Sequence, residues 1–193
     1  MFQTSPLIRN LIIINVVIFL FQKLVPVTEY LLMLWPLNTE NFKAYQLFTY
    51  MFAHGSFSHI FFNMLALASF GPILESYWGD RKFLIFYIAT GIGAGLIYAG
   101  LNYFIGNGGP MLGASGAIYG ILMAFGMVFP NLEIMLLFPP IPLKAKYMVF
   151  VMGAITYAMD QSGQVAHAAH FGGAVAAFIL ITIWRKQGRN RGW

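Results

Sequence analysis

Cysteine is absent from this 193-residue chain, and charged residues make up only 9% of it. The lack of cysteine excludes disulfide bonds, a thiol nucleophile and cysteine-ligated metal. The shortage of charge excludes an ordinary soluble domain, in which about 25% of residues are charged. Because 59% of the residues are hydrophobic, the composition indicates an integral membrane protein, built as a single transmembrane domain over residues 1–193.

Long apolar runs are the main feature that is present. A membrane span needs about 20 mostly apolar residues, with a range of roughly 17–25. The sequence predicts an all-α polytopic membrane protein, a bundle of six transmembrane helices followed by a basic tail at 185–193. The spans are expected at 7–21, 56–77, 83–104, 112–129, 145–159 and 165–184.

Basic residues are distributed unevenly between the ends of these spans. If the N-terminus is cytoplasmic, only Lys23 and Lys43 lie outside, and the other nine of the eleven Lys and Arg residues lie at cytoplasmic helix ends or in the tail. This is the pattern of the positive-inside rule. It predicts that both termini are cytoplasmic, and it explains the net charge of +5 without nucleic-acid binding.

Four polar side chains fall at a similar depth in the predicted spans. Ser115 and His170 each lie about 14 residues from the cytoplasmic end of their helix, which corresponds to roughly 21 Å. His59 and Asn63 lie at roughly 24 and 18 Å in a third helix. Polar groups inside a membrane are unfavourable and mark functional sites. We expect these four to form one site, which opens to the outer face.

The chemistry of these residue types favours acyl transfer. A serine hydroxyl is a weak nucleophile and needs an adjacent base, and no carboxylate lies inside a span at this depth. We therefore predict a pair of Ser115 as nucleophile and His170 as base. Small residues let two helix backbones approach closely. They are Gly116 and Gly120 on the fourth helix and Ala169, Gly173 and Ala177 on the sixth.

Further residues are expected to support this pair. Tyr119 lies one helical turn after Ser115, where its ring can orient the imidazole. His59 and Asn63, four residues apart, share a helix face, and with the Ser115 N–H they can donate to an oxyanion. Gly113 and Ala114 are assigned to the same oxyanion site. Water must reach Ser115 from outside, so we expect the fifth helix and the polar stretch Met159–Gln164 to act as a lid.

These motifs carry a family resemblance over nearly the whole chain. Gly113-x-Ser115-Gly116, His170-x-x-Gly173 and His59-x-x-x-Asn63 resemble the rhomboid intramembrane serine proteases. The resemblance implies a six-helix fold, a Ser–His dyad, and hydrolysis of peptide bonds in or near transmembrane segments of substrate proteins, with no cofactor or metal. The lack of an appended helix resembles the simplest prokaryotic members, which implies a bacterial plasma membrane. Tyr45-Gln46 departs from the Trp-Arg or Trp-Gln pair usual in the family.

Other interpretations remain open. Ser115 alone is compatible with a small packing residue between helices. The four histidines are compatible with a metal-binding or transport protein, and a family member without activity would act as a binding module. Among the other histidines, we interpret His167 as structural and His54 as a residue at the membrane interface.

Overall fold

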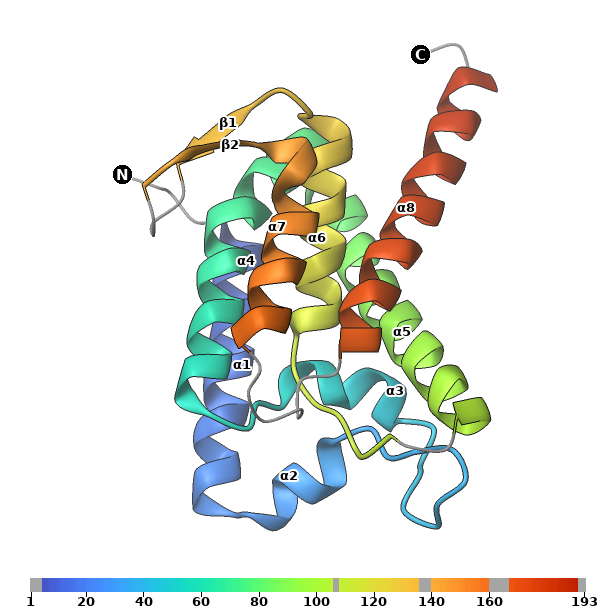
Figure 1. Cartoon of the computed structure of the whole chain (residues 1–193). Helices are drawn as coiled ribbons and strands as arrows, with labels where there is room; N and C mark the ends of the chain where they lie inside the picture. Colours follow the sequence, from blue (N-terminus) through green and yellow to red (C-terminus); the bar gives the residue numbers. More distant parts are fainter. Residues whose placement is uncertain (1–4, 106–107, 136–139, 160–166, 191–193) are drawn as a thin grey trace.

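The structure is a computed structural model that describes residues 5–105, 108–135, 140–159 and 167–190. It is mostly helical, with a two-stranded sheet at one end (Figure 1). The elements in chain order are α1 (Pro6–Leu24), α2 (Val27–Leu32), α3 (Gln46–Thr49), the 3-10 helix η1 (Tyr50–Phe52), α4 (Phe57–Trp78), α5 (Asp80–Ile105), α6 (Ser115–Val128), β1 (Glu133–Met135), β2 (Pro142–Lys144), α7 (Ala145–Met159) and α8 (His167–Asn190).

Six of these helices are apolar, and they differ in whether they are long enough to cross a membrane. In the described part of the chain, α1, α4, α5 and α8 are long and apolar enough to cross a bilayer, whereas α6 and α7 are shorter apolar helices. Serine caps set two of the starts. Ser5 accepts the Ile8 N–H at 3.2 Å before α1, and Ser56 accepts the His59 N–H at 3.2 Å before α4.

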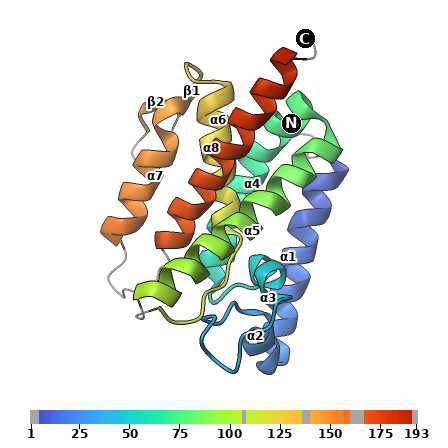
Figure 2. The same cartoon turned by 90° about the vertical axis from the view of Figure 1, so that its right-hand side faces the viewer.

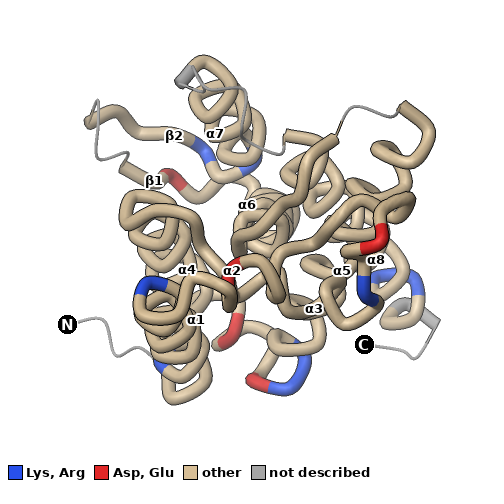
Figure 3. The backbone as a smooth tube through the Cα atoms, turned by 90° about the horizontal axis from the view of Figure 1, so that it is seen from below, with Lys and Arg blue, Asp and Glu red and all other residues tan. Residues whose placement is uncertain are grey.

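Helix α6 lies in the middle of the bundle. Seen from below, it is surrounded by α4, α5, α7 and α8, and no charged residue lies on it (Figure 3). Glycines allow this dense packing. A β-carbon on Gly116 would lie 2.6 Å from that of Ala94, and one on Gly120 would lie 2.8 Å from Thr90. Gly120 therefore contacts α5, and Gly116 is the glycine that also meets α8.

The contact between α6 and α8 is made by backbone. A β-carbon on Gly173 would collide with the carbonyl oxygen of Gly116, so the two helices approach as closely as small residues permit. Figures 1 and 2 show that α8 crosses α6 and α5 and then extends away from the bundle. The helix continues past Trp184 as far as Asn190, so most of the predicted tail is helical.

A β-hairpin joins α6 and α7, where the sequence analysis predicts no strand. β1 and β2 pair antiparallel, with Glu133 opposite Lys144 and Met135 opposite Pro142. Each strand has only three residues and Pro142 begins the second, so neither has the alternating run that identifies a strand in a sequence. Residues 136–139 lie outside the described part.

The long connection between α1 and α4 folds against the bundle. It contains α2, α3 and η1, which lie together at the end opposite the hairpin (Figure 1). Tyr50 is buried and donates its hydroxyl to the Gly91 carbonyl of α5 at 2.6 Å. Leu34 pairs with Met111 through two backbone hydrogen bonds of 2.8 and 2.9 Å. This connection therefore fixes the segment that leads into α6.

The start of α1 and the end of α8 both lie at the hairpin end of the molecule (Figure 1). Arg9 is near the start of α1, and Arg185 and Lys186 are near the end of α8, so these basic residues gather at that end. Lys23, in the last turn of α1, lies at the opposite end. We refer to the two ends as the basic end and the loop end.

Candidate active site

Ser115 is the first residue of α6, and it follows a turn whose geometry requires glycine. Gly113 has φ +122°, a conformation that side chains rarely adopt, and a β-carbon there would lie 2.5 Å from His59 Nε2. The Gly113 N–H donates to the Tyr50 carbonyl at 2.9 Å. The turn thus sets the start of α6 beside His59, and the Ser115 N–H is one of the unpaired donors at a helix N-terminus.

The structure brings His170 to Ser115. The His170 Nε2 atom lies 2.9 Å from Ser115 Oγ, which is hydrogen-bonding distance. The two residues are 55 positions apart in the chain, and their helices start at the same level, midway along the bundle (Figure 1). Gly173, about one turn after His170, packs on Gly116, the residue directly after Ser115, and this packing sets the distance.

Tyr119, on α6, packs against the His170 imidazole. Its ring stacks on that of His170 with centroids 4.2 Å apart and an angle of 10° between the planes. The Tyr119 hydroxyl lies 2.9 Å from Thr156 Oγ1, and Thr156 itself donates to the Met152 carbonyl, so the tyrosine donates to the threonine. Thr156 has no motif around it, and the sequence analysis did not identify it.

His59 and Asn63 lie near the start of α4, beside the turn that precedes Ser115. Asn63 is buried, and its Nδ2 donates to the His59 carbonyl at 3.0 Å. An amide nitrogen carries a second N–H, which leaves Asn63 able to donate to a ligand. His59 Nε2 is the atom nearest to the position that a β-carbon on Gly113 would occupy.

The other two backbone amides that the sequence analysis assigned to the oxyanion have acceptors within the protein. The Gly113 N–H is bound by Tyr50, and the Ala114 N–H points to His54 Nε2 at 3.5 Å. The N–H groups of Gly113 and Ala114 are therefore bound within the protein, and the assignment of oxyanion donors stays a prediction.

The His54 side chain is fully buried, a feature that its interpretation as an interfacial residue did not include. Its ring meets the ring of His59 edge-on with centroids 5.0 Å apart. Burial, with the charge of His59 as a smaller cause, lowers the pKa of His54 from 6.5 to about 3. The sequence could not show this, because the residues that enclose His54 come from distant segments.

His167 lies next to the pair but does not replace His170. Its ring is 6.0 Å from that of His170 and 5.2 Å from that of Tyr157. His170, rather than His167, contacts Ser115.

Among the described residues, no side chain or backbone group is a hydrogen-bond partner of His170 Nδ1. Glu75 is buried near the end of α4, where Ser5 donates its hydroxyl to it. Asp160 and the rest of the predicted lid segment, 160–164, lie outside the described residues. Within the part of the chain that is described, no group of three or more His, Asp or Glu side chains can hold a metal.

Comparison with known proteins agrees with the motifs. The family model described as the Rhomboid domain matches residues 41–187. Rhomboid protein 1, mitochondrial, of Saccharomyces cerevisiae is 35% identical over 130 residues, which are 64% of this chain and 37% of that protein. Presenilin-associated rhomboid-like protein, mitochondrial, of Homo sapiens is 30% identical over 151 residues, which are 70% of this chain and 38% of that protein.

A third relative covers more of the chain. RHOMBOID-like protein 12, mitochondrial, of Arabidopsis thaliana is 28% identical over 173 residues, which are 80% of this chain and 51% of that protein. The chain thus spans about half or less of the length of these curated relatives. All three are named as mitochondrial proteins, and this finding overturns the prediction of a bacterial plasma membrane.

The predicted resemblance is confirmed by the extent of these matches. The family model covers residues 41–187 and therefore includes every residue assigned to the site, from His54 to His170. The chain belongs to the rhomboid family.

Proposed function

We propose that this protein is an intramembrane serine endopeptidase that uses Ser115 as nucleophile and His170 as general base. The observation that carries the proposal is the 2.9 Å contact between His170 Nε2 and Ser115 Oγ in a chain of the rhomboid family. A hydroxyl next to an imidazole nitrogen is the arrangement that activates serine for attack on a carbonyl. A serine that only packs between helices does not need this partner.

The proposed reaction has two steps. In the first, His170 Nε2 takes the Ser115 hydroxyl proton as Oγ attacks the scissile carbonyl, and the imidazolium then gives that proton to the leaving amine. In the second, His170 takes a proton from water, whose oxygen attacks the acyl-enzyme, and returns the proton to Ser115 Oγ. The carboxylate product leaves, and the free serine is restored.

The negative oxygen that forms in each step needs donors. We assign this role to the Ser115 N–H, the His59 ring and the Asn63 amide. The His59 ring lies against Gly113, two residues before Ser115, and Asn63 lies one helical turn beyond His59 and is bonded to its carbonyl. Tyr119 acts on the base rather than on the substrate. Its stacked ring and the Thr156 hydrogen bond keep the His170 imidazole in the plane that points Nε2 at Ser115.

We further propose that α1, α4, α5, α6, α7 and α8 all cross the membrane. Helix α6 has 14 residues, or roughly 21 Å of helix, which is shorter than the hydrocarbon core of about 30 Å. Its start therefore lies below the membrane surface, and the chain from Met111 to Ala114 connects it to the loop end. Water reaches Ser115 from that end.

Substrates of such a site are membrane proteins whose transmembrane segments enter from the bilayer. Because the relatives are named as mitochondrial proteins, we infer that the proposed reaction takes place in a mitochondrial membrane. We propose no cofactor, since the Ser115–His170 pair and its donors supply the nucleophile, base and oxyanion contacts that hydrolysis of an amide needs. An inactive binding module would not need a serine and a histidine at hydrogen-bonding distance.

Covalent labelling tests the proposed chemistry directly. A fluorophosphonate probe reacts with a serine hydroxyl only when a base activates it. We expect the purified protein to be labelled at Ser115, and His170→Ala to abolish the labelling. Ser69→Ala is the matched control, because Ser69 also lies on an apolar helix but its hydroxyl donates to its own helix, to Leu65 at 2.7 Å. Folded protein without labelling at Ser115 would contradict the proposal.

A further inference from the structure

His54 is a buried histidine that the proposed reaction does not use. Its backbone is fixed by Gln22, at the end of α1, which is itself buried. The His54 N–H donates to Gln22 Oε1 at 3.0 Å, and Gln22 Nε2 donates to the His54 carbonyl at 3.4 Å. The Gln22 side chain thus supplies the hydrogen-bond partners that both backbone groups of this buried loop residue need.

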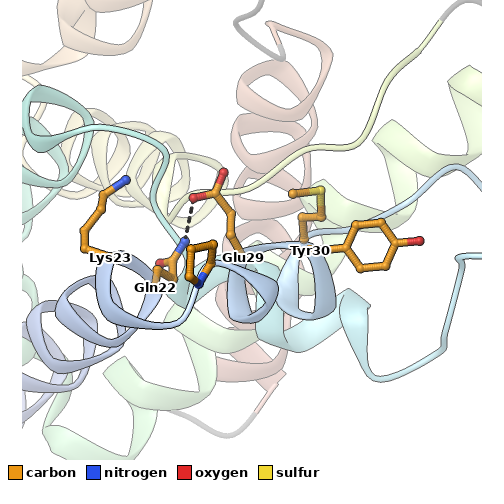
Figure 4. A pocket seen from close by; sticks show the side chains of 6 residues that line it. Gln22, Lys23, Glu29 and Tyr30 are labelled. Atoms are coloured by element: carbon orange, nitrogen blue, oxygen red, sulfur yellow. Dashed lines mark hydrogen bonds between the residues drawn. The ribbon is translucent and has the colours of Figure 1, made fainter.

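The end of α1 is in turn tied to two other parts of the loop end. Gln22 Nε2 also donates to Glu29 Oε2 of α2 at 3.2 Å, and Figure 4 shows this bond where the two helices meet. Lys23 donates to the Gly55 carbonyl at 3.1 Å, next to His54. These contacts join α1, α2 and the segment before α4 into one support for His54.

The His54 ring lies between the two halves of the candidate site. On one side, Nε2 faces the Ala114 N–H at 3.5 Å. On the other side, the ring meets the edge of His59. An imidazole nitrogen accepts a hydrogen bond only when it carries no proton. The low pKa of His54, about 3, keeps the ring neutral at ordinary pH.

We propose that His54 is a positioning residue for the proposed hydrolysis, and that Gln22 holds it in place. The inference rests on the proposed function of Ser115 and His170. His54 binds the Ala114 N–H and supports the His59 ring, so that the Ser115 N–H and His59 face the same oxyanion.

The turn before Ser115 shows why such a support is needed. Three consecutive N–H groups leave this turn. Tyr50 takes the first, at Gly113, and His54 takes the second, at Ala114. Only the third, at Ser115, remains for a substrate. Rotation of the peptide between Gly113 and Ala114 would move the Ser115 N–H, and misplacement of a catalytic group by about 1 Å costs roughly 100-fold in rate.

The test compares His54→Leu, which removes the acceptor and keeps the apolar volume, with His54→Gln, whose Oε1 can replace Nε2 as acceptor. The readouts are kcat and KM for cleavage of a transmembrane substrate in detergent, with the melting temperature as a check of folding. We expect His54→Leu to lower kcat about 10- to 100-fold at an unchanged KM, and His54→Gln to recover most of that loss. A residue that only filled space would show no such recovery.

A second pair of variants leaves the His54 ring in place. Gln22→Ala removes the support, and Asn15→Ala is its matched control, because Asn15 is a buried amide on the same helix whose Nδ2 donates only to Leu11 of that helix. We expect a lower kcat for Gln22→Ala and an unchanged kcat for Asn15→Ala. This pair decides the question if His54→Leu does not fold.

Two results would overturn the inference, and they are separable from a failure of the proposed function. Full kcat in folded His54→Leu, or equal losses in His54→Leu and His54→Gln, would show that His54 does not position the site. Cleavage that is absent in the wild-type protein, or that survives Ser115→Ala, would instead show that the proposed function is wrong, and the role of His54 would fall with it.

Discussion

Helices α8 and α7 both pack against α6, but they contact it in different ways. On the α8 side, Gly173 sits directly on the Gly116 carbonyl, so backbone meets backbone. On the α7 side, the contact near the site is made by side chains. A β-carbon on Gly153 would lie 3.8 Å from the Tyr119 ring, which is an ordinary van der Waals distance. Near the site, therefore, the helix that carries the proposed base contacts α6 through backbone, and α7 contacts α6 through side chains.

The difference matches the separate tasks that we propose for the two helices. A base must keep its distance from the nucleophile, and backbone contact allows little variation in that distance. Helix α7 meets α6 tightly at its start, where Gly126 lies against the Ala145 carbonyl. Its outer face is apolar and exposed, at Phe150 and Tyr157 for example. This construction is compatible with the expected movement of α7 as a lid.

The largest effect is expected where backbone meets backbone. Gly173→Ala places a methyl group where the Gly116 carbonyl lies, which forces α8 away from α6 and lengthens the contact between His170 and Ser115. We expect kcat to fall at least about 100-fold, because the base is displaced by about 1 Å or more. Gly153→Ala, on α7, adds the same methyl group at an ordinary van der Waals distance from the Tyr119 ring, so it displaces nothing and is expected to leave kcat within about twofold.

Comparison of these two variants tests whether the α6–α8 contact sets the distance between Ser115 and His170. Both substitutions are Gly→Ala within an apolar helix, so their effects on helix propensity are matched. Turnover measured on folded, monodisperse protein gives the answer. Equal turnover in the two variants would mean that the α6–α8 contact does not set the distance between Ser115 and His170.

An intermediate effect is expected at Tyr119, which touches both helices. Its ring stacks on His170 of α8, and its hydroxyl bonds Thr156 of α7. Tyr119→Leu removes both contacts and should lower kcat about 3- to 10-fold, since an aromatic pair contributes about 0.5–1.5 kcal/mol. Tyr119→Phe keeps the stack and should lower kcat less. If the two variants lose the same activity, the hydroxyl rather than the stacked ring orients His170.

The smallest effect on turnover is expected from loosening α7. Val149 is buried between α7 and α6, in a cluster with Tyr119, Leu122 and Met148. Val149→Ala should lower the free energy of unfolding by about 1–2 kcal/mol through the cavity it leaves, and it should change kcat by less than about threefold. Thermal unfolding and turnover are measured on the same preparation. A loss of turnover as large as that of Gly173→Ala would erase the distinction between the two sides.

The pattern of the sequence predicted the helices and the residues at the centre of the site better than it predicted their supports. Ser115, His170, His59 and Asn63 are polar residues in apolar runs, and that contrast identifies them in a linear sequence. Gly116 and Gly173 stand out for the related reason that small residues permit close helix packing.

The supports lacked such a signal because they depend on contacts between distant segments. His54 stands in the connection before a helix, and nothing around it in the sequence indicates that it is buried. Its backbone is bound by Gln22, which lies 32 residues away, and its ring faces Ala114, which lies 60 residues away. Thr156 shows the same limit, since only the packing of α7 on α6 brings it to Tyr119. Gly120 was assigned to the contact with α8, but the twist of α6 directs it to Thr90 of α5.

One measurement tests the central claim most directly: cleavage of a single-span substrate protein in lipid vesicles, with the cut site identified by mass spectrometry of the products. We expect the wild-type protein and Ser69→Ala to cut in or near the transmembrane segment. We expect Ser115→Ala and His170→Ala each to form no product. Undiminished cleavage by folded Ser115→Ala protein would contradict the account.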